Sequence, residues 1–339
     1  MKLAFSDIQA ITSGAERVLQ RPEGIQFSRF TEEQETLYLE KKNQFRFKVS
    51  SASGIRLTFR TNSQKLGLKV LTENGSGRKY FSFDVFVNGK MIDALDNFSG
   101  LEIPAMYTNL VTSFGEFSKE FCLGEGEKEV TVYFPWSAKV ILQELELDNG
   151  ATVVPAIPKK KLLVWGDSIT QGFDALRPSN KYITRIADWL GAEEYNKGIG
   201  GDCFWPELAD THEDFTPDYI IAAYGTNDWL ISSEEVFMED CRGFYQNLSN
   251  RYPNVQIFAI TPLWRVNGKK GERFCAHDQV DSKIRQLVKD LPNVIPISGY
   301  PLVPHEEGMF ADLVLHPNDV GFDYYFKNLK EAMAVYIRK

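Results

Sequence analysis

The spacing of the hydrophobic residues changes near residue 155, and this change limits the possible folds more than any other feature of the sequence. Between residues 40 and 148, apolar and polar residues alternate over short runs, among them Phe45/Phe47/Val49, Ile55/Leu57/Phe59, Leu66/Leu68/Val70 and Val130/Val132/Phe134. Such alternation is typical of half-buried antiparallel strands. The pair Asn88-Gly89 favours a two-residue hairpin turn, because both turn positions require a positive φ. Since no convincing helix interrupts this stretch, we predict an all-β sandwich of jelly-roll type.

The rest of the chain alternates strand-like and helix-like segments. Four short apolar runs are typical of strands buried on both faces of a parallel sheet, namely Leu162–Trp165, Tyr219–Ala223, Ile257–Ile260 and Val294–Ile297. Apolar residues at helical spacing occupy 182–190, 280–288 and 322–333. We therefore predict a doubly wound, flavodoxin-like α/β domain. A linker at Ile157–Lys161 follows Pro155, so we expect a β-sandwich domain at 1–155 and an α/β domain at 156–339.

The composition excludes several classes of protein. With 43% hydrophobic and 25% charged residues, the chain has the balance of a soluble protein with a full-sized core. Its net charge of −8, most of which arises after residue 156, would repel nucleic acid and anionic membranes. The sequence shows no signal peptide, no apolar run of about 18 residues and no CxxC pair among its four cysteines. We expect a cytoplasmic monomer or homo-oligomer whose partner is a small molecule or an oligosaccharide.

Candidate functional groups follow the predicted parallel strands, where such sheets place their binding sites. Ser168 in Gly166–Thr170 stands at a helix start, where it can act as a nucleophile or merely cap the helix. The glycine-rich segment Asn196–Asp202 allows close approach of a ligand to the backbone, or forms a tight turn. The Asn227 side chain can donate a hydrogen bond to an oxyanion, or serve as a turn residue.

The chain has only four histidines, so histidine chemistry has few candidates. His316 precedes Pro317, which places it on a rigid loop before the last predicted helix. The other three stand in polar surroundings and are expected at the surface: His212, His277 and His305. His316 is therefore the candidate general base.

Taken together, these segments resemble the SGNH (GDSL-type) hydrolases. Ser168 in GDSIT, Asn227 in GTND and His316 in LHPND match three of the four motifs of that family, and Gly201 matches the fourth better than Gly198 does. The resemblance covers about residues 160–339. More loosely, the first half resembles the β-sandwich that precedes the catalytic domain in a subset of bacterial SGNH carbohydrate acetylesterases.

The chain departs from the family pattern at the acidic residue. The family places an aspartate three residues before the histidine, but this position is Leu313, and Asp312 stands four before. A one-residue bulge would still bring Asp312 to the imidazole Nδ1. Otherwise a backbone carbonyl orients the ring, or Asp319 takes the role. We favour Asp312.

The resemblance implies a serine esterase that works through an acyl-enzyme. Ser168 would attack, His316 would take its proton, and Asp312 would hold the imidazole. The N–H groups of Ser168 and Gly201, with the Asn227 amide, would form the oxyanion hole. No segment has the motif of a nucleotide cofactor site or the spacing of metal ligands, so we expect neither a cofactor nor a metal.

The substrate is expected to be a short acyl ester, most simply an acetyl ester of a carbohydrate. Several aromatic residues stand in or beside the strand-end loops, and about half of them are expected to pack in the core: Trp165, Phe173, Phe204, Trp205, Trp229 and Trp264. Asp167, Trp229 and Trp264 are the candidate substrate contacts. A lipid or thioester acylhydrolase and a non-catalytic carbohydrate-binding protein are the alternatives.

Overall fold

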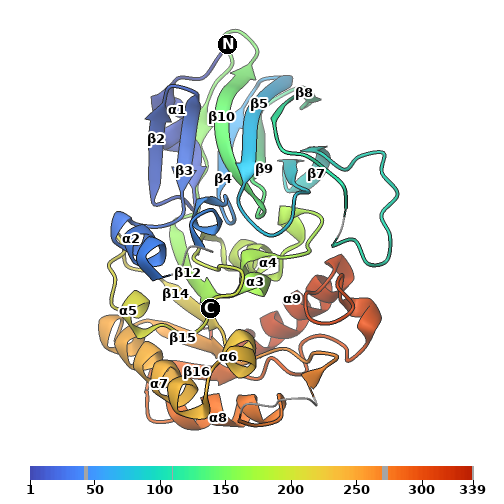
Figure 1. Cartoon of the computed structure of the whole chain (residues 1–339). Coiled ribbons are helices and arrows are strands. Elements are labelled where there is room, and N and C mark those ends of the chain that lie inside the picture. The colour runs from blue at the N-terminus through green and yellow to red at the C-terminus, as the bar shows by residue number, and fades with distance from the viewer. Residues whose placement is uncertain (42–44, 109, 269–273, 338–339) are drawn as a thin grey trace.

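The structure is a computed structural model that describes residues 1–41, 45–108, 110–268 and 274–337. Two antiparallel sheets form the upper part of the molecule in Figure 1, and a parallel sheet covered by helices forms the lower part. The α/β and β-rich regions predicted from the hydrophobic pattern are thereby confirmed.

The two antiparallel sheets enclose one hydrophobic core. In spatial order, the first sheet consists of β2 (Arg17–Arg21), β3 (Gly24–Ser28), β10 (Ala138–Leu147), β5 (Lys65–Asn74) and β8 (Glu116–Cys122). The second consists of β1 (Thr12–Ser13), β4 (Arg56–Thr61), β9 (Lys128–Tyr133), β6 (Ser82–Val87) and β7 (Lys90–Asp96), with β11 (Val154–Pro155) paired to β4. Phe27 of the first sheet and Phe83 of the second both contact Phe134, with ring centroids 5.1 and 5.3 Å apart. The sheets therefore pack face to face.

Local sequence signals predict five of these eleven strands, namely β4, β5, β6, β7 and β9, and one predicted strand is wrong. Asn88 and Gly89 form the β6–β7 turn with φ values of 49° and 76°, as their residue types require. The predicted strand at residues 45–49 is wrong, because Lys48–Ser50 forms a 3₁₀ helix (η2). The buried side chains of Phe45 and Val49 in this segment pack against the α/β layer. Their apolar spacing therefore resembles that of a strand although no strand forms.

The parallel sheet has the strand order β13-β12-β14-β15-β16. Its strands are β12 (Lys160–Gly166), β13 (Ala192–Asn196), β14 (Tyr219–Ala223), β15 (Gln256–Ile260) and β16 (Val294–Ile297). Numbered along the chain this order is 2-1-3-4-5, as in flavodoxin-like folds, where the reversal of strand order lies between the first and third strands. Ligands bind in such folds at the carboxyl ends of these two strands, here β12 and β14.

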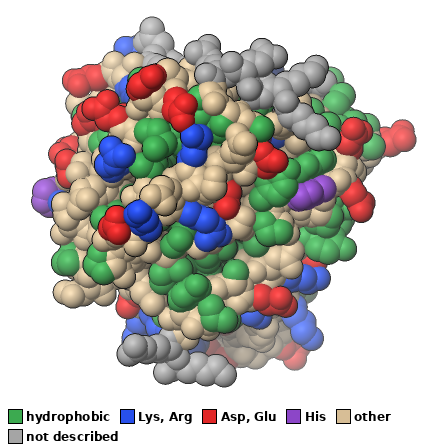
Figure 2. All heavy atoms as spheres, turned by 90° about the horizontal axis from the view of Figure 1, so that it is seen from below, with side chains coloured by type: hydrophobic (Ala, Val, Ile, Leu, Met, Phe, Trp, Pro, Cys, Tyr) green, Lys and Arg blue, Asp and Glu red, His purple; other side chains and the backbone are tan. Residues whose placement is uncertain are grey.

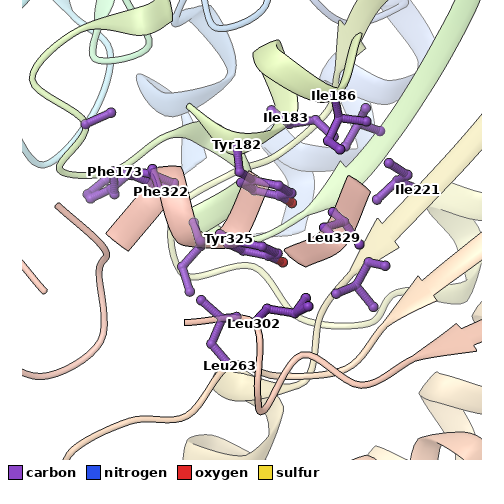
Figure 3. Packing of buried hydrophobic residues seen from close by; sticks show 14 of the residues in the cluster. Phe173, Tyr182, Ile183, Ile186, Ile221, Leu263, Leu302, Phe322, Tyr325 and Leu329 are labelled. Atoms are coloured by element: carbon purple, nitrogen blue, oxygen red, sulfur yellow. The ribbon is translucent and has the colours of Figure 1, made fainter. Parts of the chain in front are cut away.

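Helices cover both faces of this sheet. One face carries α4 (Tyr182–Leu190) and α9 (Asp319–Ala334), and the other carries α5 (Pro206–Ala209), α7 (Glu234–Arg251) and α8 (Gln279–Val288). In the core between the sheet and helices α4 and α9, the rings of Tyr182 and Tyr325 stack with centroids 3.9 Å apart (Figure 3). The short helices α3 (Ser168–Gln171) and α6 (Thr226–Ile231) follow β12 and β14, where they form part of the candidate site.

The first part of the chain also contributes to the core of the α/β layer. Helix α1 (Phe5–Ile11) lies against the antiparallel sheets, whereas α2 (Glu32–Lys41) places Tyr38 in the core between the parallel sheet and α7. Two further 3₁₀ helices complete the described elements, η3 (Pro178–Asn180) and η5 (Glu307–Met309). The division at residue 155 stays a prediction, because residues before it are shared between the two cores.

The described helices include none that is both long and apolar enough to cross a membrane. The face seen in Figure 2 shows basic, acidic and hydrophobic side chains interspersed. The acidic excess of the sequence therefore does not form a continuous charged surface on this side of the molecule.

Candidate active site

Ser168 lies at the carboxyl end of β12, as the first residue of α3. Asp167 caps this helix, since its Oδ1 accepts a hydrogen bond of 2.9 Å from the Ile169 N–H. A Cβ on Gly166 would lie 2.3 Å from Thr170 Oγ1, so only glycine fits at this turn. The tight turn directs the Ser168 hydroxyl toward the loop that precedes α9.

The structure brings Ser168, His316 and Asp312 into one hydrogen-bonded chain. Ser168 Oγ lies 2.8 Å from His316 Nε2, and His316 Nδ1 lies 2.7 Å from Asp312 Oδ2. The Phe173 ring lies against the imidazole with ring centroids 5.4 Å apart. In this geometry the imidazole can accept the serine proton while the carboxylate orients the ring.

A local backbone turn compensates for the unusual spacing of the acid. Leu313 adopts a φ of 57°, the left-handed conformation of the predicted one-residue bulge. Asp312 Oδ1 accepts hydrogen bonds from the N–H groups of Val314, Leu315 and His316, at 2.9, 2.7 and 3.1 Å. The carboxylate is thus locked within its own turn.

The same contacts keep Asp312 ionised. Burial raises the pKa of Asp312, but the hydrogen bond and charge of His316, with the N–H groups of the turn, lower it well below its usual range. Asp319, the other candidate acid, accepts hydrogen bonds from the Leu176 N–H and the Asn180 amide instead. Of the alternatives considered, the structure places Asp312 beside Nδ1.

The glycine-rich loop and Asn227 lie next to each other. Asn227 Nδ2 donates a hydrogen bond of 2.8 Å to the Asp202 carbonyl, which joins α6 to this loop. Gly201 has a φ of 84° and is exposed, whereas the Gly198 N–H is buried and donates to Asn196 Oδ1. Within the described part of the chain, neither the Ser168 N–H nor the Gly201 N–H donates a hydrogen bond. These two groups are therefore available to an oxyanion.

Side chains from the first part of the chain hold the glycine-rich loop in place. The buried Arg29 donates to the carbonyls of Asn196 and Gly198, at 2.6 and 3.0 Å, and Lys48 Nζ donates to the Gly200 carbonyl at 2.5 Å. The sequence analysis missed both residues. No local signal could reveal them, because about 150 residues or more separate them from the loop.

Two of the predicted substrate contacts are buried, and those interpretations are corrected. Asp167 is 4% exposed, and its carboxylate is occupied in capping α3. Trp229 is 3% exposed, and its Nε1 donates a hydrogen bond to the Cys275 carbonyl inside the core. An indole in this position cannot present its face to a sugar.

Trp264 is partly exposed and lies beside the turn that carries His316. Its ring stacks on His305 with centroids 5.1 Å apart and an interplanar angle of 8°. The two residues line a cavity of about 440 Å³ together with Tyr300 and Arg265. Val266, which follows Arg265 in the chain, donates its N–H to the Val314 carbonyl in the turn that carries His316. Of the other aromatic residues considered, Trp165, Phe173 and Phe204 are buried and Trp205 is partly exposed.

Two buried carboxylates next to the site have raised pKa values. Burial raises the pKa of Asp167 to about 6, although the Ile169 N–H opposes this shift. Burial likewise raises the pKa of Asp228 to about 7, against the hydrogen bond that the Phe204 N–H donates. Both carboxyl groups therefore favour the neutral form more than an exposed carboxyl does.

The four histidines differ in their surroundings. His212 and His305 are exposed as predicted, but the prediction for His277 is wrong because it is 2% exposed. Burial, with the nearby positive charge of Arg265, lowers the pKa of His277 to about 3. His277 is therefore neutral and structural, and His316 is the histidine that contacts Ser168.

Three residues at the site offer possible metal ligands. Among the described residues, Asp174, Asp312 and His316 form the one group of such side chains whose ligand atoms lie within 4.8 Å of one another. Their ligand atoms already form other interactions: Asp312 and Ser168 bind the two imidazole nitrogens, and Arg78 binds both Asp174 oxygens. This bonding suits proton transfer better than metal coordination.

Part of the chain matches the model of a known protein family. Residues 164–324 match the model of the GDSL-like lipase/acylhydrolase family, and this range includes Ser168, Gly201, Asn227 and His316. A search of the curated proteins finds no match.

Several solved structures share the fold along almost the whole chain. A salicylyl-acyltransferase from a tetracycline biosynthetic pathway is 20% identical, with a TM-score of 0.78 over 96% of this chain and 94% of the other. A Bacteroides ovatus protein described as a GDSL-like lipase is 20% identical, with a TM-score of 0.74 over 99% and 97%. A family two carbohydrate esterase from Cellvibrio japonicus is 16% identical, with a TM-score of 0.66 over 99% of both chains. The β-rich part therefore recurs together with the α/β part.

Proposed function

We propose that this chain, whose residues 164–324 match the model of the GDSL-like lipase/acylhydrolase family, is a carboxylic ester hydrolase that removes short acyl groups, acetyl above all, from carbohydrates. The observation that carries the mechanism is the chain of hydrogen bonds from Ser168 Oγ through His316 to Asp312.

The first chemical step forms an acyl-enzyme. His316 Nε2 takes the proton of Ser168 as Oγ attacks the ester carbonyl, and the negative Asp312 stabilises the imidazolium that results. As the bond between the acyl carbon and the sugar oxygen breaks, His316 gives that proton to the sugar oxygen. In the second step His316 takes a proton from water, which attacks the acyl-enzyme. The bond between the acyl carbon and Ser168 Oγ then breaks, His316 returns the proton to Oγ, and the acid is released.

The oxyanion of each tetrahedral intermediate needs hydrogen-bond donors. The N–H groups of Ser168 and Gly201 supply two of them. Asn227 can supply the third, because its amide has two hydrogens and only one of them is needed for Asp202. One such donor contributes about 3–4 kcal/mol to lowering the barrier in other enzymes.

The cavity beside the His316 turn supports a carbohydrate as the leaving group. Trp264 and His305 present stacked rings there, and Arg265 adds a hydrogen-bond donor. Aromatic ring faces can pack against the C–H groups of a sugar ring, while the neighbouring polar groups can bind its hydroxyl groups. The structural similarity to a family two carbohydrate esterase favours the same class of substrate. We further propose that the protein acts in the cytoplasm, since its described cysteines form no disulfide.

Hydrolysis of nitrophenyl acetate tests the reaction. The wild-type protein should hydrolyse the ester and react with a fluorophosphonate probe, and Ser168→Ala should lose both properties while its circular dichroism spectrum stays unchanged. Retained hydrolysis in Ser168→Ala would exclude Ser168 as the nucleophile. A folded wild-type protein that neither hydrolyses esters nor takes the probe would indicate the non-catalytic binding protein.

The acyl group and the alcohol need separate measurements. Acetyl esters should react faster than octanoyl esters and acyl thioesters, and the reverse order would favour a lipid or thioester acylhydrolase. A screen of acetylated oligosaccharides, read by mass spectrometry as the loss of acetyl groups, should then identify the sugar. Transfer of the acetyl group to an added alcohol, in place of hydrolysis, would point to an acyltransferase.

A further inference from the structure

A second carboxylate lies beside the candidate catalytic histidine. Asp174 follows α3 and is fully buried, and its Oδ2 lies 3.7 Å from His316 Nδ1. Asp312 Oδ2 lies 2.7 Å from the same nitrogen. The imidazole N–H therefore donates to Asp312, while Asp174 lies just beyond hydrogen-bond distance and acts on the ring through its charge. Neither the SGNH motifs nor the spacing of the sequence points to this second carboxylate.

Residues of the β-rich part hold Asp174 in this position. Arg78 forms a two-pronged ion pair with it, Nε to Oδ1 at 2.6 Å and Nη2 to Oδ2 at 2.9 Å, and the Tyr80 hydroxyl donates to Oδ1 at 2.7 Å. The Tyr107 hydroxyl donates to the Asp174 carbonyl at 2.6 Å. Asp174 has a φ of 69°, a conformation that costs free energy for a residue other than glycine. These contacts from outside its own segment stabilise that conformation.

The same part of the molecule supports the imidazole from behind. Phe173 lies against His316, and Trp136 packs against Phe173 with ring centroids 5.0 Å apart. The Arg78 guanidinium carbon lies 5.5 Å from the centre of the Phe173 ring. Arg78 therefore contacts both the ring that backs the histidine and the carboxylate that faces it.

We propose that Asp174, held by Arg78, is a positioning residue whose charge stabilises the His316 imidazolium. Asp174 also accepts the hydrogen bond of the Nδ1–H group when Asp312 is unable to accept it. This inference rests on the proposed role of His316 as general base. The carboxylate adds negative charge where the imidazolium forms. The Arg78 guanidinium offsets part of that charge.

The other charged groups near His316 are few. Asp312 is the partner in its own turn, and Asp167 below Ser168 acts on it through its charge. Arg265, on the loop after β15, is close enough to act on Asp312 and Asp167. A change confined to Asp174 or Arg78 leaves these three groups in place, so its effect on His316 can be measured separately.

Direct titration of the His316 ring by NMR tests the proposal without any substrate. Asp174→Asn removes the anion and should lower the pKa of His316 by about half to one unit. Arg78→Gln exposes the anion and should raise that pKa by a similar amount, whereas Arg78→Lys keeps the charge and should leave it near the wild-type value. Shifts of Asp174→Asn and Arg78→Gln in the same direction, or no shift in either, would overturn the proposal.

Kinetics supply the second measurement. Because His316 must be neutral to act as base, the acid limb of kcat/KM should move to lower pH in Asp174→Asn and to higher pH in Arg78→Gln. Asp312→Asn should retain at least about 10-fold more activity than the Asp312→Asn/Asp174→Asn double variant. Equal activity of the two would overturn the role of Asp174 as substitute acceptor. If no ester is hydrolysed at all, the proposed function fails, while the NMR titration still decides whether Asp174 acts on His316.

Discussion

Replacing Arg29 by methionine tests whether the first part of the chain positions the glycine-rich loop. Arg29 is fully buried and donates five hydrogen bonds, to the carbonyls of Ser51, Asn196, Gly198 and Lys48 and to the Ser51 hydroxyl. Methionine has a similar length and no donor, so the variant leaves these buried acceptors without their partner.

The expected loss follows from those contacts. Each buried polar group left without a partner costs about 1–3 kcal/mol, but removal of a buried charge returns part of its desolvation energy. We therefore expect a net decrease of about 3–5 kcal/mol in the free energy of unfolding. Lys48 and Gln171 still bind Gly200. The loop should consequently shift rather than unfold, and a shift of the Gly201 N–H by about 1 Å should lower kcat about 10- to 100-fold.

Urea unfolding monitored by tryptophan fluorescence gives the free energy of unfolding. Hydrolysis of nitrophenyl acetate, measured without urea and at a temperature at which the variant is folded, gives kcat. Arg17→Met is the matched control, since Arg17 is part-exposed and pairs with Glu32 and Glu35 near the surface. It should cost about 1 kcal/mol or less and leave kcat unchanged. A folded Arg29→Met protein with wild-type kcat would refute the positioning of the loop by Arg29, and a stability loss as small as that of the control would refute its structural role.

Three further predictions concern stability and binding. Gly166→Ala should lower the free energy of unfolding by at least about 2 kcal/mol, because the new Cβ would overlap a neighbouring hydroxyl oxygen, whereas Gly308→Ala, which meets open space, should stay within about 0.5 kcal/mol in the same urea titration. Because burial raises the pKa of Asp228 to about 7, the folded state binds this proton more tightly than the unfolded state, and the contribution of Asp228 to stability falls as pH rises from about 4 to 7. The free energy of unfolding of Asp228→Asn, relative to that of the wild type, should therefore be about 1–3 kcal/mol higher at pH 8 than at pH 4. An equal difference between the two proteins at both pH values would contradict a raised pKa of Asp228. Trp264→Ala should raise KM for acetylated oligosaccharides but not for nitrophenyl acetate. Trp229→Ala, at a buried position, should instead lower the free energy of unfolding by about 3–5 kcal/mol. An equal effect of Trp264→Ala on both substrates would show that Trp264 does not bind the sugar.

Local patterns in the sequence predict the elements whose burial follows a simple period. The parallel strands β12, β14, β15 and β16 are buried on both faces and appear as short apolar runs. The run at residues 45–49 misleads, because its apolar residues are buried by packing against a distant layer and not by strand pairing. The strand β13 was missed, since its sequence AEEYN contains two glutamates that are nevertheless buried. Glu194, for example, is compensated there by Lys181 and Thr184.

Short local motifs predict Ser168, Asn227 and His316 as candidate site residues. Each motif specifies both the residue type and the backbone around it, since Ser168 and Asn227 follow buried strands and His316 precedes a proline. The structure is needed to choose among the candidate acids, because a leucine at position 313 does not signal the left-handed turn that brings Asp312 to the imidazole. The same holds for Arg29 on the glycine-rich loop and for Arg78 on Asp174. These side chains meet across 96 residues or more of chain, and the free energy of such contacts arises only when both parts of the molecule have folded together.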